Sequence, residues 1–219
     1  LLAIAPLAKN AKGSVLFPAR MHMLFKGISG VYACANADCN CSHTEGGLTL
    51  GEIYLSDGNL ICPHCGSVVY ELYNDRRCGA LFFKGYVLED DAELHGNVYL
   101  WRYPGQLMDH RMKEVHLFIP TEDFELPVKQ GKNAIKPCYL DVKSGFINFT
   151  DDSSAGKPWV RKLYYCNYSA KGRPQIITFP TCPHCRHQLS TSQLTSFSTR
   201  GNQSFFNLIK SQFQLQPAV

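Results

Sequence analysis

Two short cysteine pairs with the same spacing are the clearest chemical feature of this chain. Both read Cys-Pro-His-Cys, at 62–65 and at 182–185, and the chain has ten cysteines in all. A pair separated by two residues points both sulfurs at one place, which suits a tetrahedral zinc ion about 2.3 Å from each sulfur. In a secreted chain, ten cysteines would instead form disulfides, but a pair this tight rarely serves two separate disulfides. The spacing therefore predicts zinc binding.

An upstream pair of cysteines completes a first set of four thiolates. Together the two pairs predict one site: Cys34, Cys39, Cys62 and Cys65. Cys41 is an alternative to Cys39. Gly66 follows the last ligand, where such a turn often needs a residue that tolerates positive φ. Four thiolates leave no open coordination position, so we expect a structural site. His43 and His64 are interpreted as solvated loop residues.

The pair at 182–185 needs two further ligands, because two cysteines cannot complete a zinc shell. Cys78-Gly79 has the form of the closing half of another such turn, and Asp75 stands three residues before it. A carboxylate binds zinc at about 2.0–2.2 Å. A second site is therefore predicted from Asp75, Cys78, Cys182 and Cys185. Alternatives for its fourth ligand are Cys166, His184 and His187. The lone Cys138 is interpreted as a buried small hydrophobic residue.

Short β-strands are the elements that must position these ligands. Nine runs of apolar, aromatic and β-branched residues alternate with glycine- and proline-rich turns; they are 30–34, 48–55, 68–73, 81–87, 98–103, 115–119, 145–150, 160–168 and 175–179. Helical patterns are confined to 1–12 and 204–213, and 121–136 is predicted to be a surface loop. We expect a mainly β fold with zinc knuckles or ribbons and few short helices.

The charge of the chain is distributed unevenly. Residues 1–127 hold 10 Lys and Arg against 15 Asp and Glu, whereas 128–219 hold 12 against 3, so halves of −5 and +9 give the net +4. The basic half interleaves cations with aromatic rings, a pattern that suits single-stranded nucleic acid. The residues predicted to contact DNA are Lys157, Trp159, Arg161, Lys162, Lys171 and Arg173. The alternative is a solvated basic surface whose rings face the core.

Composition limits the remaining functions. The chain has 219 residues, 45% hydrophobic and 18% charged, which is typical of a globular protein. No apolar run is long enough to span a membrane, and the first residues lack the basic start of a signal peptide. We expect a cytoplasmic fragment of a longer chain. Phosphate-loop, H-E-x-x-H, G-x-S-x-G and zinc-deaminase patterns are absent, so we expect no enzymatic activity from this fragment.

The order of these motifs resembles a known family. Pro18-x-Arg20-x-His22, Gly30-Val31-Tyr32-Ala33-Cys34, the 62–66 and 179–185 cysteine turns and Thr199-Arg200-Gly201 resemble the cysteine-rich module between the two motor domains of large prokaryotic DEAD/DEAH-box (superfamily 2) helicases. Those of the Druantia anti-phage systems are similar. The family pattern would place C-x-x-C at 75–78, where this chain has Asp75.

The resemblance implies a division of the chain and a set of partners. Segment 1–30 would lead into a zinc-binding module at 31–200, and 201–219 would form a helix leading to a motor domain outside the fragment. The parent would unwind DNA or translocate on it with ATP, and its partners would be DNA, the motor domains of the same chain and other defence subunits. A module that docks a partner subunit through its acidic half is the alternative function. The all-cysteine first site argues against a third possibility, a zinc hydrolase.

Overall fold

The computed structural model describes residues 9, 11–13, 28–88, 97–104, 112–126, 133–149, 155–170, 173–189 and 194–197. The chain divides into two compact units, one of residues 1–27 with 201–219 and one of residues 28–200. The helices predicted at 1–12 and 204–213 lie almost entirely outside the described residues, and the predicted division into three segments stays a prediction. Within the described part of the chain, no helix is long and apolar enough to cross a membrane.

Thirteen strands make up the secondary structure of the described residues. They are β1 (Tyr32–Cys34), β2 (His43–Glu45), β3 (Leu48–Leu50), β4 (Ile53–Tyr54), β5 (Val69–Asp75), β6 (Leu81–Leu88), β7 (Asn97–Tyr99), β8 (Met112–Phe118), β9 (Asn133–Asp141), β10 (Phe146–Asn148), β11 (Val160–Ala170), β12 (Arg173–Ile177) and β13 (Leu194–Ser196). The predicted mainly β fold is confirmed.

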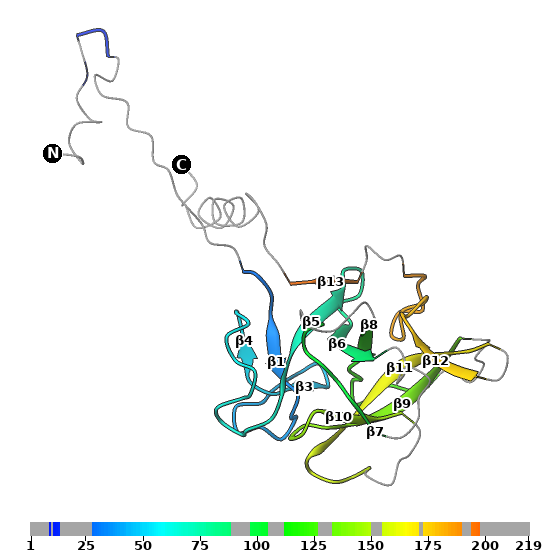
Figure 1. Cartoon of the computed structure of the whole chain (residues 1–219). Coiled ribbons are helices and arrows are strands. Elements are labelled where there is room, and N and C mark those ends of the chain that lie inside the picture. Colours follow the sequence, from blue (N-terminus) through cyan, green and yellow to red (C-terminus); the bar gives the residue numbers. More distant parts are fainter. Residues whose placement is uncertain are drawn as a thin grey trace. The chain divides into compact units, whose positions relative to one another are not determined.

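Eleven of the strands form one antiparallel sheet (Figure 1). Its order is β4-β1-β5-β6-β8-β11-β9-β10-β7, with β12 added on β11 and β13 on β5. The chain after β7 returns to β6, where the backbones of Tyr86 and Trp101 exchange hydrogen bonds of 2.7 and 2.8 Å. The sheet therefore curls round and closes on itself. The remaining strands, β2 and β3, form a separate hairpin.

Apolar side chains cover both faces of the central strands. Because neighbouring residues of a strand point to opposite faces, Leu163 and Tyr165 of β11 pack into the main core, whose members include Leu72, Phe83, Leu117, Leu140 and Ile147. Tyr164 and Cys166 point the other way, into a second cluster with Phe82, Phe118 and Phe179. Cys138 is completely buried in the main core, as predicted.

The structure differs from the sequence prediction at several strands, and β2, β9 and β13 lie outside the nine predicted runs. The loop predicted to run to residue 136 ends earlier, because β9 begins at Asn133 and pairs with β11 along its whole length. Pro137 argues against a strand at this position, since proline is rare within sheets. It is accommodated beyond the last β9–β10 pair, Asn148 with Tyr139. The single strand predicted at 48–55 is split into β3 and β4 at Gly51 and Glu52.

Candidate metal centres

Three turns of the chain share one backbone pattern. In each, the first ligand residue donates its N–H to the carbonyl five residues later and accepts, at its own carbonyl, the N–H four residues later. The bonds are Cys62 to Ser67 and Gly66 to Cys62, both 2.8 Å; Asp75 to Ala80, 2.9 Å, and Gly79 to Asp75, 2.8 Å; and Cys182 to His187, 2.8 Å, and Arg186 to Cys182, 3.0 Å. Asp75 thus occupies the place that cysteine takes in the other two turns.

The residue after the second ligand has a positive φ in all three turns. It is Gly66 (φ 67°), Gly79 (φ 77°) and Arg186 (φ 63°), and Arg186 is the one residue other than glycine with positive φ among the described residues. The predicted role of Gly66 is confirmed. A side chain at such an angle costs about 1–2 kcal/mol through contact of Cβ with the backbone.

Arg186→Gly is expected to raise stability by roughly 0.5–1 kcal/mol, because it removes this strain at some cost in chain entropy. Toward the described residues, the Arg186 side chain has one weak hydrogen bond, 3.4 Å to the Glu125 carbonyl. Thermal unfolding of the two proteins tests this. Gly66→Arg, the reverse change at the matching position, should lower the melting temperature. A lower melting temperature for Arg186→Gly would contradict the strain.

The first predicted ligand set comes together as one group. The sulfurs of Cys34, Cys39, Cys62 and Cys65 all lie within 4.8 Å of one another. Those of Cys34 and Cys65 are 3.4 Å apart, and those of Cys39 and Cys62 are 3.8 Å apart. Ligands 2.3 Å from a tetrahedral ion lie about 3.8 Å from each other, and all ten cysteines are free thiols. The group could hold a metal ion.

Few apolar contacts support this group. Among the described residues, its buried apolar neighbours are Tyr32 and Val69, in a cluster separate from the main core, with the partly buried Tyr54 packed against them. Burial raises the pKa of the Cys34 thiol. At Cys65 burial also acts upward, but hydrogen bonds from Ser67 and the neighbouring thiols outweigh it and lower the pKa to about 6. Tyr54, which the sequence did not single out, donates a hydrogen bond to the Cys62 sulfur at 3.3 Å. A metal ion would supply the attraction that the apolar contacts lack.

Gly51 lets the chain between β3 and β4 approach the first site. A Cβ atom there would lie 2.7 Å from both the Cys34 Cβ and the Asn36 carbonyl oxygen. Gly51→Ala is therefore expected to displace Cys34, to cost about 1–3 kcal/mol and to weaken metal retention. Chemical unfolding and metal content measure the two effects. Gly58→Ala, which has open space around it, is the control. Unchanged values for Gly51→Ala would contradict this packing.

The second predicted ligand set also forms one group. The ligand atoms of Asp75, Cys78, Cys182 and Cys185 lie within 4.8 Å of one another. Asp75 Oδ2 lies 3.3 Å from the Cys78 sulfur and 3.6 Å from that of Cys185, and the sulfurs of Cys78 and Cys182 are 3.6 Å apart. The three alternatives for the fourth ligand lie outside the group: Cys166 is in a core cluster, and His184 and His187 are exposed.

The two carboxylate oxygens of Asp75 have different partners. Oδ1 accepts the Arg77 backbone N–H at 2.9 Å, so Oδ2 is left for the three thiols. Burial acts to raise the pKa of Asp75, but the Arg77 N–H and the thiols lower it below its usual value. The side chain is only 1% exposed. An ionised, buried carboxylate with one oxygen fixed matches the needs of a single-oxygen metal ligand.

Strand β5 connects the two groups. The Cys62 turn precedes its first residue and Asp75 is its last, so the groups lie at opposite ends of a seven-residue strand, about 20 Å apart. Figure 1 shows β5 between β1 and β6. A metal ion at each end of β5 would fix the loops that precede and follow this strand.

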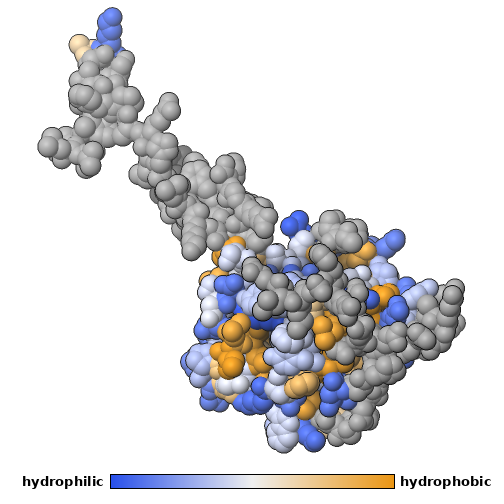
Figure 2. All heavy atoms as spheres, in the orientation of Figure 1, coloured by the Kyte–Doolittle hydropathy of each residue, from blue (hydrophilic) through white to orange (hydrophobic). Residues whose placement is uncertain are grey.

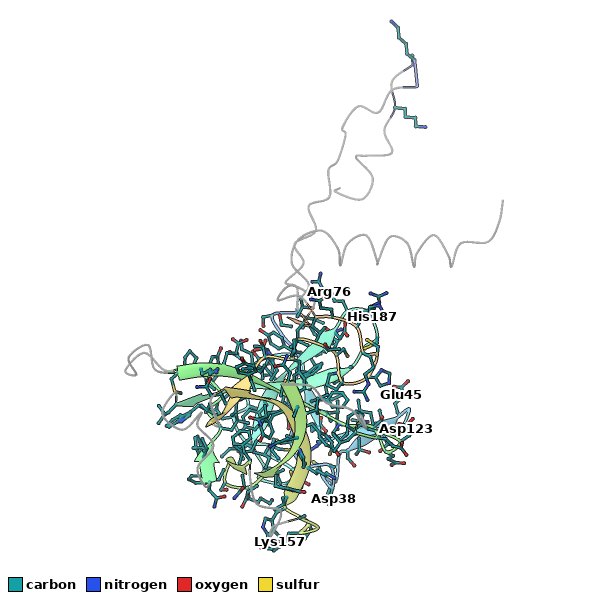
Figure 3. The ribbon with its side chains drawn as sticks, turned by 90° about the vertical axis from the view of Figure 1, so that its right-hand side faces the viewer. Asp38, Glu45, Arg76, Asp123, Lys157 and His187 are labelled. Atoms are coloured by element: carbon teal, nitrogen blue, oxygen red, sulfur yellow. The ribbon has the colours of Figure 1, made fainter. Side chains whose placement is uncertain are left out.

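The residues predicted to bind DNA have different environments. Lys157 and Lys162 are exposed and Trp159 is 45% exposed. Tyr164 and Tyr165 are buried, so these two rings face cores. Figure 3 shows Lys157 at one end of the sheet domain (residues 28–200), and Arg76 and His187 at the other end. Lys171 lies outside the described residues, as does the side chain of Arg173, the first residue of β12.

Arg161 departs from the expectation. Its guanidinium donates to the backbone carbonyls of Ala35 and Thr49 and lies 5.3 Å from the Phe83 ring centroid. Burial lowers its pKa to about 10. This side chain ties β11 to the loops around the first site, so its donors are used inside the protein. The alternation along β11 that separates Arg161 from Lys162 could have indicated this, but the sequence does not show which face is covered.

Comparison with known proteins identifies the class of this chain. Residues 54–200, which include every ligand of the second group and the Cys62–Cys65 turn of the first, match the YjiV N-terminal domain family. The chain belongs to this family.

A curated relative extends the comparison to the whole length. The chain is 29% identical to Druantia protein DruE of Escherichia coli (strain UMEA 4076-1) over 229 aligned positions. The match covers 100% of the chain and 12% of DruE, so the chain corresponds to a small part of its relative. No solved structure matches.

Proposed function

We propose that this chain is a zinc-stabilised accessory module of an ATP-dependent DNA helicase that acts in anti-phage defence. The observation that carries the proposal is the pair of four-ligand groups at the two ends of β5. Thiolate-rich sets with four protein ligands are typical of structural zinc, because no position is left for a substrate. The similarity to DruE supports the defence role. ATP hydrolysis would belong to motor domains in the rest of the parent chain.

Contact with DNA is the second part of the proposal. With Arg161 engaged inside the protein, the interface would rely on Lys157, Trp159 and Lys162 at the start of β11. Two lysines and one exposed ring provide few contacts. The affinity for single-stranded DNA should therefore resemble non-specific binding, with Kd of about 10⁻⁴–10⁻⁶ M.

Lys157→Ala/Lys162→Ala is expected to weaken binding to all DNA sequences alike and to reduce the dependence of log K on log salt by about two units at most. Trp159→Ala should cost about 1–3 kcal/mol without changing the salt dependence. Fluorescence anisotropy with labelled single strands at two salt concentrations measures both. Arg76→Ala/Arg77→Ala removes two exposed charges from the turn after β5 and is the matched control; Arg76 lies at the opposite end from Lys157 (Figure 3). Equal losses of DNA affinity in both double variants, or no DNA binding by the unsubstituted 219-residue chain at low salt, would contradict a DNA interface.

An exposed apolar surface favours the second candidate function, docking of a protein. Leu55, Leu60 and Ile61 are 61%, 59% and 59% exposed, and they lie in the acidic half. Leu55 directly follows edge strand β4, and the Leu60 carbonyl accepts the N–H of Val69, the first residue of β5. Figure 2 shows apolar residues gathered over this region. Apolar docking resists salt, unlike phosphate contact. Leu60→Ser/Ile61→Ser should therefore weaken co-purification with the remainder of the parent chain at high salt. If the double variant is retained as well as the unsubstituted 219-residue chain, this surface does not dock the rest of the longer protein.

A further inference from the structure

A third group of metal-ligating side chains lies outside the two four-ligand groups. Cys41, Glu52 and His64 each offer one ligand atom, and the three atoms lie within 4.8 Å of one another. They come from separate segments: the loop after β1, the link between β3 and β4, and the interior of the Cys62–Cys65 turn. Sequence spacing gives no sign of this group, because only the folding of the hairpin back onto β1 brings Glu52 to the other two.

The backbone around the first site holds these three residues in place. Next to Cys41, the Ser42 N–H donates a hydrogen bond to the Cys39 carbonyl at 2.9 Å. The Glu52 carbonyl accepts the Cys34 N–H at 2.8 Å. His64 is flanked by two ligands of the first site. Formation of the first site therefore positions the third group without requiring any of its side chains as ligands.

The donor set indicates which ion would bind. One thiolate, one imidazole and one carboxylate suit zinc, and three protein ligands leave a fourth position for water or an external donor. The side chains of Cys41 and Glu52 are half-buried and that of His64 is exposed, so a bound ion would be reached by solvent. We propose that Cys41, Glu52 and His64 form an additional, solvent-accessible zinc site with one open coordination position, beside the first structural site.

The experiment is a zinc titration of the 219-residue chain already loaded at its two four-ligand groups. A chromophoric zinc indicator reports the binding of further ions. The parent chain should take up one additional equivalent. Cys41→Ser, Glu52→Gln and His64→Asn should each weaken that uptake at least about tenfold, while the tightly held zinc and the melting temperature stay unchanged. His43→Asn, at an exposed histidine of β2 outside all three groups, should bind as the parent does.

Three outcomes would overturn the site. The first is no additional equivalent in the parent chain, and the second is uptake equal to the parent's in all three variants. The third is loss of tightly held zinc in Cys41→Ser alone, which would make Cys41 a ligand of the first site. Because the structural zinc is measured in the same samples, failure of this site is distinguished from failure of the two four-ligand groups.

Discussion

Cys62→Ser is expected to abolish zinc binding at the first site and to unfold the segments around it. Zinc bound to a structural site contributes about 10–16 kcal/mol that is also folding free energy. The apolar cluster at this site is too small to compensate, with Tyr32 and Val69 as its buried members besides the ligands. Cys34→Ser, at the end of β1, should have the same effect. Zinc analysis and limited proteolysis measure the loss.

Cys166→Ala provides the control for these variants. Cys166 is equally buried but belongs to the second apolar cluster and to no ligand group. Its replacement should cost only the small free energy of a cavity and should leave the zinc content unchanged. Folded, protease-resistant Cys62→Ser and Cys34→Ser proteins with the zinc content of the parent would show that the first site is wrongly assigned.

Asp75→Ala is expected to remove one zinc ion per chain and to loosen the turn between β5 and β6. It takes away the oxygen that lies 3.3 and 3.6 Å from two of the thiols, and it also frees the Arg77 N–H that Oδ1 accepts. Asp75→Cys should retain the ion and hold it more tightly, since its turn already has the hydrogen bonds of the Cys62 and Cys182 turns and a fourth thiolate would complete the shell.

Competition with a chelator measures this difference. The expected order of zinc retention at the second site is Asp75→Cys, then the parent chain, then Asp75→Ala. Asp123→Ala removes an exposed carboxylate elsewhere in the sheet domain (Figure 3) and should retain zinc as the parent does. A parent chain that holds one ion per molecule, with no change in Asp75→Ala, would mean that the second site is not used.

Much of the fold and of both ligand groups could be predicted from local spacing. Turns of the C-x-x-C type fix their own backbone geometry, so the equivalence of Asp75 with a cysteine was already visible three residues before Cys78. Long-range features were not visible. Strand β9 was not predicted, because it contains Pro137 and forms only through its long-range pairing with β11. The hydrogen bonds of Arg161 inside the protein were not predicted, because the backbone carbonyls that accept them lie more than a hundred residues away in the sequence.

The zinc-to-sulfur ratio of the purified chain, measured by particle-induced X-ray emission after a brief wash with chelator, tests the two structural sites most directly. Ten cysteines and four methionines supply fourteen sulfurs per chain, so the sample calibrates its own protein concentration. The wash removes ions from any solvent-accessible site. Two structural sites predict two zinc atoms for every fourteen sulfurs, and one after Asp75→Ala. A folded chain without zinc, or with another metal in its place, would contradict zinc-stabilised folding.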